Sequence, residues 1–365
     1  MIEHIEIENF KSLQKVSLDL GPLNIFVGTN ASGKTNFLEA LRVLQGIGYG
    51  YTVDEILNGR PKLGNTEAWE GIRGGSKYAR FLGSEGPIQL RVGARLPPEV
   101  SVKYNVIISP NDATLGAERC DDEDLLMPDR SRSGLRQAAK GPMTGRMMAL
   151  ILEFSDAQFL APVASVQREY SMARMAVRLG DRGENFAALL KTIQRDEAKF
   201  SDYVSWLKEL TPAELDSIEI LINPDGAFTF AFQRGGVDYT ARVLSDGTLR
   251  FAAIAAAFFQ PSLPRKLILE EIEDGLHPTR LQLLIELLKS QAGTGIEQVF
   301  ATTHSPYTIA WLDEEDYRYV FLCTKDDETG ATTIIPFTEV PHLIEVARRH
   351  PISDLLARGW LETAV

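Results

Sequence analysis

One segment constrains this chain more than any other: residues 28–35, Gly-Thr-Asn-Ala-Ser-Gly-Lys-Thr, fit the pattern G-x-x-x-x-G-K-[ST]. It follows an apolar run at residues 23–27, typical of a strand buried on both faces, and precedes residues 35–45, whose apolar spacing without Gly or Pro predicts a helix. In such a strand–loop–helix unit, glycines let backbone N–H groups surround phosphate oxygens, and the helix N-terminus adds a favourable dipole. We therefore predict a phosphate-binding loop in which Lys34 contacts the β- and γ-phosphates and Thr35 ligates Mg²⁺.

The composition places this loop in a globular protein of more than one structural unit. The chain has 365 residues, is 44% hydrophobic and 24% charged, and carries a net charge of −12, which excludes wholesale disorder and a polycation built to coat nucleic acid. Two cysteines, Cys120 and Cys323, cannot form a disulfide framework and lack the spacing of a metal site. Because we find neither a signal peptide pattern nor an apolar run long enough to span a bilayer, we expect a cytoplasmic protein without a membrane partner.

The rest of the chain predicts strands and helices on either side of a less regular middle region, residues 46–180. Residues 2–8 and 14–20 alternate apolar and polar side chains, as half-buried strands do. Alternation of strands and helices in the C-terminal half favours a mainly parallel sheet with flanking helices. The expected helices there are 185–210, 249–259 and 279–291, and the expected strands are 217–223, 226–232, 238–243, 266–269 and 298–302.

A basic run interrupts the middle region after the acidic residues 121–124. Its members are Arg130, Arg132, Arg136, Lys140 and Arg146. Such a run is either a solvated loop or helix face, or a surface that docks phosphates or a partner. Both interpretations stay open at the level of sequence.

Three further segments carry residues suited to nucleotide chemistry. Residues 243–249, Val-Leu-Ser-Asp-Gly-Thr-Leu, place Ser245 and the N–H groups around Gly247 at a helix start, where they form either an anion site or a plain N-cap. The buried strand 266–269 ends in Glu270 and Glu271, and the strand at 298–302 leads to His304. Carboxylates and an imidazole at strand ends are groups that activate water or contact phosphate, although a lone histidine there is often structural.

In this order the four segments resemble the Walker A, signature, Walker B and switch-histidine motifs of ABC-type ATPases. The form L-S-D-G-T, the opening Ile-Glu-Ile-Glu-Asn-Phe-Lys-Ser (residues 5–12) and the turn Glu-Asp-Gly-Leu-His-Pro (residues 273–278) are similar to the SMC/RecF/OLD-like group of bacterial ATP-binding proteins. The resemblance covers roughly residues 1–45 and 183–312. It implies an α/β P-loop NTPase fold: an ABC-ATPase head with a mixed sheet flanked by helices and an inserted helical or irregular lobe.

The resemblance also implies domains and an assembly. Residues 1–95 and 183–365 would form the two halves of the ATPase domain, and residues 96–182 the inserted lobe, placed where SMC proteins extend their coiled coil. We expect a head-to-tail homodimer, or a higher oligomer, in which the signature of one copy binds ATP held by the other. We expect no TOPRIM nuclease after His304, because the tail is short, and hence a separate effector such as a nuclease or toxin, with DNA as a further partner.

The site residues follow from matching positions. ATP and Mg²⁺ are the implied cofactors; Lys34, Glu271 and His304 are the expected catalytic residues, and Thr35 and Glu270 the metal-site residues. By analogy, residues 9–12 line the adenine side or serve only as a strand-to-turn connection, and Gln89 and Gln167 are candidates for the Q-loop glutamine. The expected nucleotide-binding residues are Asn30, Ala31, Ser32, Gly33, Lys34, Thr35, Asn36, Ser245 and Gly247.

Two departures from the family pattern bear on activity. The family normally places Asp where Glu270 stands and Pro where Ile272 stands, and the longer carboxylate makes slow turnover a real alternative. The leading hypothesis is an ATP-hydrolysing dimer that acts on DNA or controls an effector in anti-phage defence. The alternatives are a nucleotide-gated scaffold with slow or no turnover, and a RecF-like repair protein. A transporter ATPase subunit is disfavoured by the opening and turn motifs, and an AAA+ ring does not explain L-S-D-G-T followed by a switch histidine.

Overall fold

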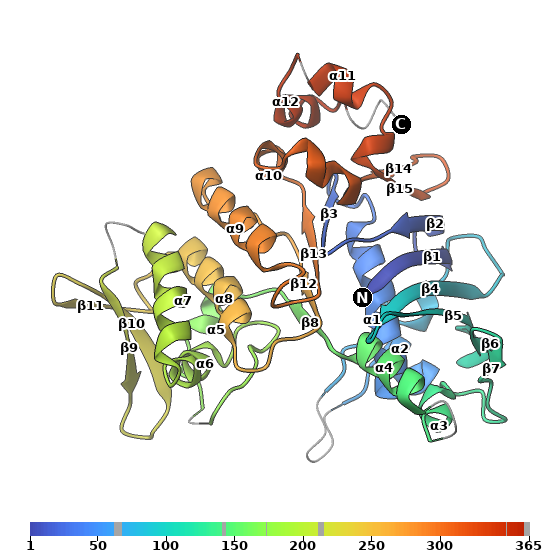
Figure 1. The fold of residues 1–365 in the computed structure, drawn as a ribbon, viewed down its shortest axis with the longest axis horizontal. Coiled ribbons are helices and arrows are strands. Elements are labelled where there is room, and N and C mark those ends of the chain that lie inside the picture. Colours follow the sequence, from blue (N-terminus) through green and yellow to red (C-terminus); the bar gives the residue numbers. More distant parts are fainter. Residues whose placement is uncertain (62–67, 141–143, 173, 211–214, 348, 361–365) are drawn as a thin grey trace. The chain divides into compact units, whose positions relative to one another are not determined.

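The computed structural model of the protein describes residues 1–61, 68–140, 144–172, 174–210, 215–347 and 349–360. Its contacts divide the chain into two compact units. The larger unit contains residues 1–157 and 313–365, and the smaller unit contains residues 158–312. Figure 1 shows the elements of both along the chain.

The larger unit contains an antiparallel sheet with the strand order β2-β1-β4-β5-β6-β7 (Figure 1). In β1 the side chains of Ile5 and Ile7 are buried and those of Glu6 and Glu8 are partly exposed, so the alternation predicted for residues 2–8 is confirmed. One face of the sheet therefore covers a core while the other carries charge. The strands are β1 (Ile2–Phe10), β2 (Leu13–Asp19), β4 (Ile88–Leu96), β5 (Val100–Ser109), β6 (Thr114–Cys120) and β7 (Glu123–Asp124).

A second set of strands in this unit leads into the phosphate loop. Strand β3 (Leu23–Val27) is parallel to β14 (Val320–Lys325), which is antiparallel to β15 (Thr332–Pro336), so this part of the fold is mixed. The turn at residues 326–330 joins β14 to β15, as expected of a hairpin.

Helix α1 (Lys34–Tyr49) of the larger unit follows the phosphate loop directly. It buries Phe37, Leu41 and Leu44 and packs against α4 (Thr144–Ser155). The shorter helices of this unit are α2 (Val53–Asn58), α3 (Leu135–Ala138), α11 (Leu343–Ala347) and α12 (Ile352–Ala357), with 3-10 turns at Ser76–Tyr78, Glu314–Tyr319 and Phe337–Glu339.

The smaller unit contains two fully buried parallel strands, β12 (Lys266–Leu269) and β13 (Gln298–Thr303). Strand β8 (Ala157–Leu160) leads into this unit, which also holds an antiparallel sheet of β9 (Ser217–Ile222), β10 (Phe228–Arg234) and β11 (Val237–Thr240). Helix α8 (Asp246–Phe259) is buried on nearly all sides. The other helices are α5 (Ala164–Gln167), α6 (Phe186–Ile193), α7 (Glu197–Leu210), α9 (Pro278–Gln291) and α10 (Pro306–Ala310).

Most predicted elements on either side of the middle region are confirmed, with two informative differences. Helix α8 begins at Asp246 rather than at residue 249, because the Ser245 side chain accepts a hydrogen bond from Thr248 N and caps the helix. The helical pattern at residues 185–210 is two helices, and Asp196 begins the second by accepting from the backbone N–H of Lys199.

The middle region is more ordered than its sequence indicated. Strands β5 and β6 extend the antiparallel sheet through a segment expected to be helical or irregular. The two compact units divide at residues 157/158 and 312/313, whereas the predicted lobe spans residues 96–182. The boundaries of that lobe stay a prediction.

Candidate nucleotide-binding site

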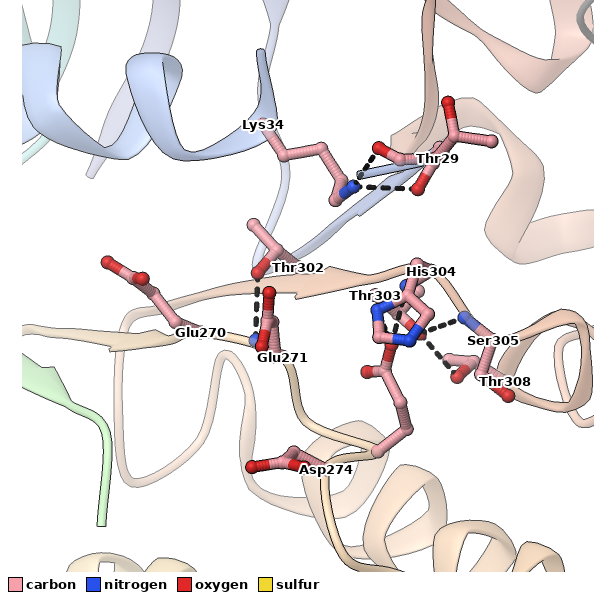
Figure 2. A network of polar contacts seen from close by, with 12 residues as sticks. Thr29, Lys34, Glu270, Glu271, Asp274, Thr302, Thr303, His304, Ser305 and Thr308 are labelled. Carbon is pink, nitrogen blue, oxygen red and sulfur yellow. Dashed lines mark hydrogen bonds and ion pairs between the residues drawn. The ribbon is translucent and has the colours of Figure 1, made fainter. Parts of the chain in front are cut away.

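The phosphate loop is closed by its own lysine. Lys34 Nζ donates to the carbonyl oxygens of Gly28 at 2.6 Å and Thr29 at 2.7 Å (Figure 2), and lies 3.5 Å from Ser32 Oγ. These acceptors belong to the loop itself, so an anion entering the loop competes with them for the protons of the ammonium group. Asn30 and Ala31 lie exposed in the same loop.

Gly33 is the residue on which the loop geometry depends. Its φ is +100°, a conformation that L side chains rarely adopt. A Cβ at this position would also lie 2.1 Å from Thr332 Oγ1. Both backbone conformation and space therefore require glycine at the position that the motif predicts.

A network of hydrogen bonds beside the loop involves two of the predicted nucleotide-binding residues, Ser32 and Asn36. Asn36 Nδ2 donates to Ser12 Oγ at 2.6 Å, and Ser12 Oγ lies 2.6 Å from Thr332 Oγ1, which donates to Ser32 O at 3.0 Å. Asn36 thus holds the strand-to-turn segment against α1. Its role toward a nucleotide stays a prediction.

The remaining side chains of the opening motif also have protein partners. Lys11 pairs with Glu39 of α1 and donates to Arg73 O at 2.9 Å, while Asn9 Nδ2 donates to Pro87 O at 3.1 Å. Phe10 is fully buried. These contacts account for the motif as a connection between strand and turn, and the adenine-lining role stays a prediction.

In the smaller unit, the turn after β12 presents the two predicted acidic residues. Glu271 has a φ of +48°, and its backbone N–H donates to Thr302 Oγ1 at 2.9 Å (Figure 2). The next backbone N–H, of Ile272, donates to Thr302 O at 3.1 Å. Thr302 of β13 therefore fixes the turn, and the Glu271 carboxylate is exposed beside it.

Arg250 of α8 holds the same turn from another direction. Its NH2 atom donates to the carbonyl oxygens of Glu270 at 2.8 Å and Glu271 at 2.9 Å, and its NH1 atom lies 3.3 Å from Asp274 Oδ2. Burial lowers the pKa of this guanidinium, and the surrounding carboxylates oppose the shift. Sequence analysis missed Arg250; its signal is a single cation in an otherwise apolar helix.

His304 follows β13 and is held by a second residue that sequence analysis left without a role. Its ring Nδ1 lies 2.9 Å from Glu273 Oε1, and the same oxygen accepts the His304 backbone N–H at 2.5 Å. Thr303 Oγ1 lies 2.8 Å from Thr308 Oγ1 and accepts from Ser305 N at 3.1 Å, so the loop around the histidine is fixed (Figure 2).

The predicted signature turn is an N-cap with an exposed serine. Ser245 Oγ accepts from Thr248 N at 3.2 Å, and Arg280 NH1 donates to Thr248 Oγ1 at 2.9 Å. A Cβ on Gly247 would lie 2.1 Å from Gly275 O, so the turn lies directly against the segment that follows Glu271. Gly247 therefore packs against the turn that contains Gly275, while Ser245 stays exposed at the start of α8.

A pocket of about 340 Å³ opens beside this serine. Two guanidinium groups and the N-terminus of α8 at one pocket make it suited to an anion. Arg234 and Arg280 were not found from sequence, because they lie on other elements, β10 and α9, and no local pattern links them to the motif. The lining residues are Arg234, Tyr239, Val243, Leu244, Ser245, Thr248 and Arg280.

The close approach at Gly247 gives a stability prediction. We expect Gly247→Ala to lower the free energy of unfolding by about 1–3 kcal/mol, because the new methyl group meets a backbone oxygen that cannot rotate away. Urea denaturation measures the change. Gly145→Ala is the matched control, since a Cβ there meets nothing within 4 Å. An unchanged urea midpoint for Gly247→Ala would contradict the tight packing of this turn.

The Q-loop candidates have protein contacts in both units. Gln89 Nε2 donates to Asn105 Oδ1 at 2.9 Å in the exposed face of the sheet. Gln167 is buried and its Nε2 donates to Leu249 O at 2.9 Å, with Oε1 lacking a hydrogen bond among the described residues. The assignment of the Q-loop glutamine stays open.

The basic run is partly structural. Arg136 Nε donates to Gly48 O at 3.1 Å, and Arg146 pairs with Asp121 at 2.9 Å. Arg132 and Lys140 are exposed. The run therefore combines anchoring contacts with cations available to a partner.

The residues predicted to serve Mg²⁺ offer oxygen donors. Thr35 supplies a hydroxyl at the start of α1 and Glu270 a carboxylate at the end of β12. Magnesium is usually held by one or two such groups together with substrate phosphates, so each of these two side chains is of a type that the ion takes. In the described ranges, no cluster of three or more His, Cys, Asp or Glu side chains is arranged to hold a metal by itself.

Two other expectations concern the cysteines and the membrane. Cys120 and Cys323 are free and buried, and burial raises the pKa of each thiol to about 12. No helix in the part of the chain that the structure describes is long and apolar enough to cross a bilayer.

Comparison with known proteins agrees with these motifs. The family model described as "AAA domain, putative AbiEii toxin, Type IV TA system" matches residues 150–310, and the model "AAA ATPase domain" matches residues 1–49. The two matches cover the four motif segments and support an SMC/RecF-like AAA ATPase. The family and the α/β P-loop fold expected from the sequence are thereby confirmed.

Individual relatives of this chain are distant or match only a short part of it. An ATP/GTP phosphatase of Helicobacter pylori is 21% identical over 374 residues, covering 90% of this chain and 93% of the relative. The DNA replication and repair protein RecF of Lactobacillus acidophilus is 48% identical, but only over 44 residues, 12% of either chain.

Solved structures of SMC heads share the fold. The SMC head domain of Thermotoga maritima aligns with a TM-score of 0.52 at 15% identity, covering 92% of this chain and 98% of the head domain. An SMC head bound to the C-winged helix domain of ScpA aligns with a TM-score of 0.56 at 17% identity, covering 92% and 96%.

Proposed function

We propose that the protein binds and hydrolyses ATP as a head-to-tail homodimer, in which each triphosphate is held by the phosphate loop of one copy and the Ser245 turn of the other. The observation that carries this proposal is the pocket beside Ser245. It presents an exposed hydroxyl, a helix N-terminus and the guanidinium groups of Arg234 and Arg280. A partner copy's phosphates are the anion that this chemistry fits.

The side chains that we propose to act in ATP hydrolysis come from the Walker A, Walker B and switch-histidine motifs. Lys34 would neutralise phosphate charge, the exposed Glu271 carboxylate would orient and polarise the attacking water, and His304 would contact the γ-phosphate. Bound Mg²⁺, served by Thr35 and Glu270, would offset charge on the phosphate oxygens. The name of the Helicobacter pylori relative, an ATP/GTP phosphatase, supports this reaction class.

Sedimentation of Glu271→Gln tests the assembly. This variant should bind ATP without consuming it, so we expect a monomer without nucleotide and a dimer with Mg²⁺-ATP. Lys34→Ala is the control and should stay monomeric in both conditions. A Glu271→Gln chain that remains monomeric with saturating ATP would exclude the shared site.

We further propose that the ATP cycle controls a separate effector, a nuclease or toxin, with DNA as another partner and anti-phage defence as the setting. Three observations support partner binding: the exposed cations of the basic run, the toxin–antitoxin description of the matching family model, and the ScpA domain bound to a similar SMC head. The RecF relatives support a repair role instead. Capture of binding partners by the Glu271→Gln variant in the presence of ATP distinguishes control of an effector from a role in repair.

A nucleotide-gated scaffold with little turnover is the second candidate. Glu270, where the family normally has Asp, favours it, because a longer carboxylate changes the distance to the metal shell. A measurement of kcat with Mg²⁺-ATP decides between the ATP-hydrolysing dimer and the scaffold. If the longer side chain limits the rate, Glu270→Asp should turn over faster than the wild type.

A further inference from the structure

Glu273 contacts both the backbone and the ring of His304. A single carboxylate oxygen, Glu273 Oε1, accepts the backbone N–H of His304 at 2.5 Å and lies 2.9 Å from the ring Nδ1. These two contacts fix the position of the residue and place the ring nitrogen Nδ1 beside the carboxylate. They also require that the proton of a neutral imidazole lies on Nδ1.

Burial of the Glu273 carboxylate costs free energy of folding. The Glu273 side chain is 8% exposed, whereas the His304 side chain is 42% exposed. The second oxygen, Glu273 Oε2, is buried without a hydrogen-bond partner among the described residues. A buried carboxylate with an unsatisfied oxygen is poor evidence of a stabilising role, and such groups concentrate at functional sites.

We infer that Glu273 is a positioning residue for His304: its carboxylate faces Nδ1–H, so that Nε2 faces away from the carboxylate and, when the ring is protonated, can donate its N–H to a phosphate oxygen. This inference rests on the proposed hydrolysis of ATP and adds a residue to it. The Glu273 carboxylate also balances the charge of an imidazolium that donates from Nε2 to a γ-phosphate oxygen. Glu273 does not touch the nucleotide and acts only through the ring.

The tautomer can be measured without any activity. In the full-length chain labelled with ¹⁵N-histidine and held in alkaline buffer, we expect the neutral His304 ring to show a protonated Nδ1. His304→Ala assigns the signal. In Glu273→Ala we expect the proton to move to Nε2, the nitrogen that carries it in a neutral histidine side chain without a partner. A His304 signal that is the same in Glu273→Ala and wild type would overturn the inference.

Kinetics provide the second test. We expect Glu273→Ala to lower kcat roughly ten- to a hundredfold with little change in KM for ATP, the range typical when the partner that orients a histidine is lost. Glu273→Gln should recover part of the loss, since its amide oxygen accepts the same two bonds. Glu286→Gln, an exposed carboxylate on α9, is the matched control and should have the wild-type rate.

A double variant distinguishes positioning of the His304 ring by Glu273 from an effect of Glu273 that is independent of the ring. If Glu273 acts through the ring, Glu273→Ala combined with His304→Ala should be no slower than His304→Ala alone. A further tenfold fall in the double variant would contradict the inference. A wild-type chain that hydrolyses no ATP would refute the proposed function, while the tautomer measurement would still decide the role of Glu273.

Discussion

Glu271→Gln is expected to lower kcat for ATP hydrolysis roughly 10²–10⁴-fold while leaving ATP affinity unchanged. The physical reason is that an amide retains the size of the carboxylate but cannot accept a proton from the attacking water. The backbone of the variant should be undisturbed, because Thr302 and Arg250 hold this turn through main-chain atoms. Phosphate release measures turnover, and equilibrium binding of a fluorescent ATP analogue measures affinity.

The exposed carboxylate Glu286 provides the control for this substitution as well. Glu286→Gln makes the same chemical change on α9, where its partner is Gln282, and should leave kcat unchanged. Wild-type turnover by Glu271→Gln would show that another group orients the water. Loss of ATP binding would show that Glu271 is needed for the ground state rather than for the reaction.

Two inactive variants are expected to restore activity when mixed. Lys34→Ala removes the cation of the phosphate loop, and Ser245→Glu places a negative charge in the anion pocket, so neither variant can complete a site with a second copy of itself. A mixed dimer pairs the intact loop of one copy with the intact serine turn of the other. Because only mixed pairs close around ATP, and each has one intact site of two, a rate of at most about half that of the wild type is expected.

The controls for mixing are each variant alone at the total concentration of the mixture, which should remain inactive. Activity restored in the mixture cannot come from a site within a single copy. A mixture as inactive as its components, under conditions where the wild type dimerises, would contradict the shared site and leave an ATP binder whose serine turn has another role.

The distribution of contacts shows what local sequence patterns can and cannot predict. The glycine-rich loop, its strand and its helix follow from residues 23–45, because phosphate binding and backbone conformation constrain neighbouring positions. Structure adds a second reason for Gly33, the approach of Thr332 from a distant strand. Asn36 shows the limit: its place in the motif predicts a nucleotide contact, but no local pattern predicted that its amide donates to Ser12.

The residues that sequence analysis missed share one property. Arg250, Glu273 and Arg280 each act on a segment far away in the chain, through main-chain carbonyls, a histidine ring and a threonine hydroxyl respectively. A periodic pattern reports which face of an element is buried, but it does not report which element lies against that face. An arginine in an apolar helix was visible in the sequence, yet its partners were not.

The sequence by itself determined the family, the order of the four motifs and most strands and helices, because these depend on local backbone preference and on side chains close together in the chain. Only the tertiary structure decided how the Glu271 turn is held, which residue fixes the His304 ring, and that two arginines join Ser245 in one pocket. Those features come from packing between distant segments, where burial and hydrogen-bond geometry select partners that no spacing rule specifies.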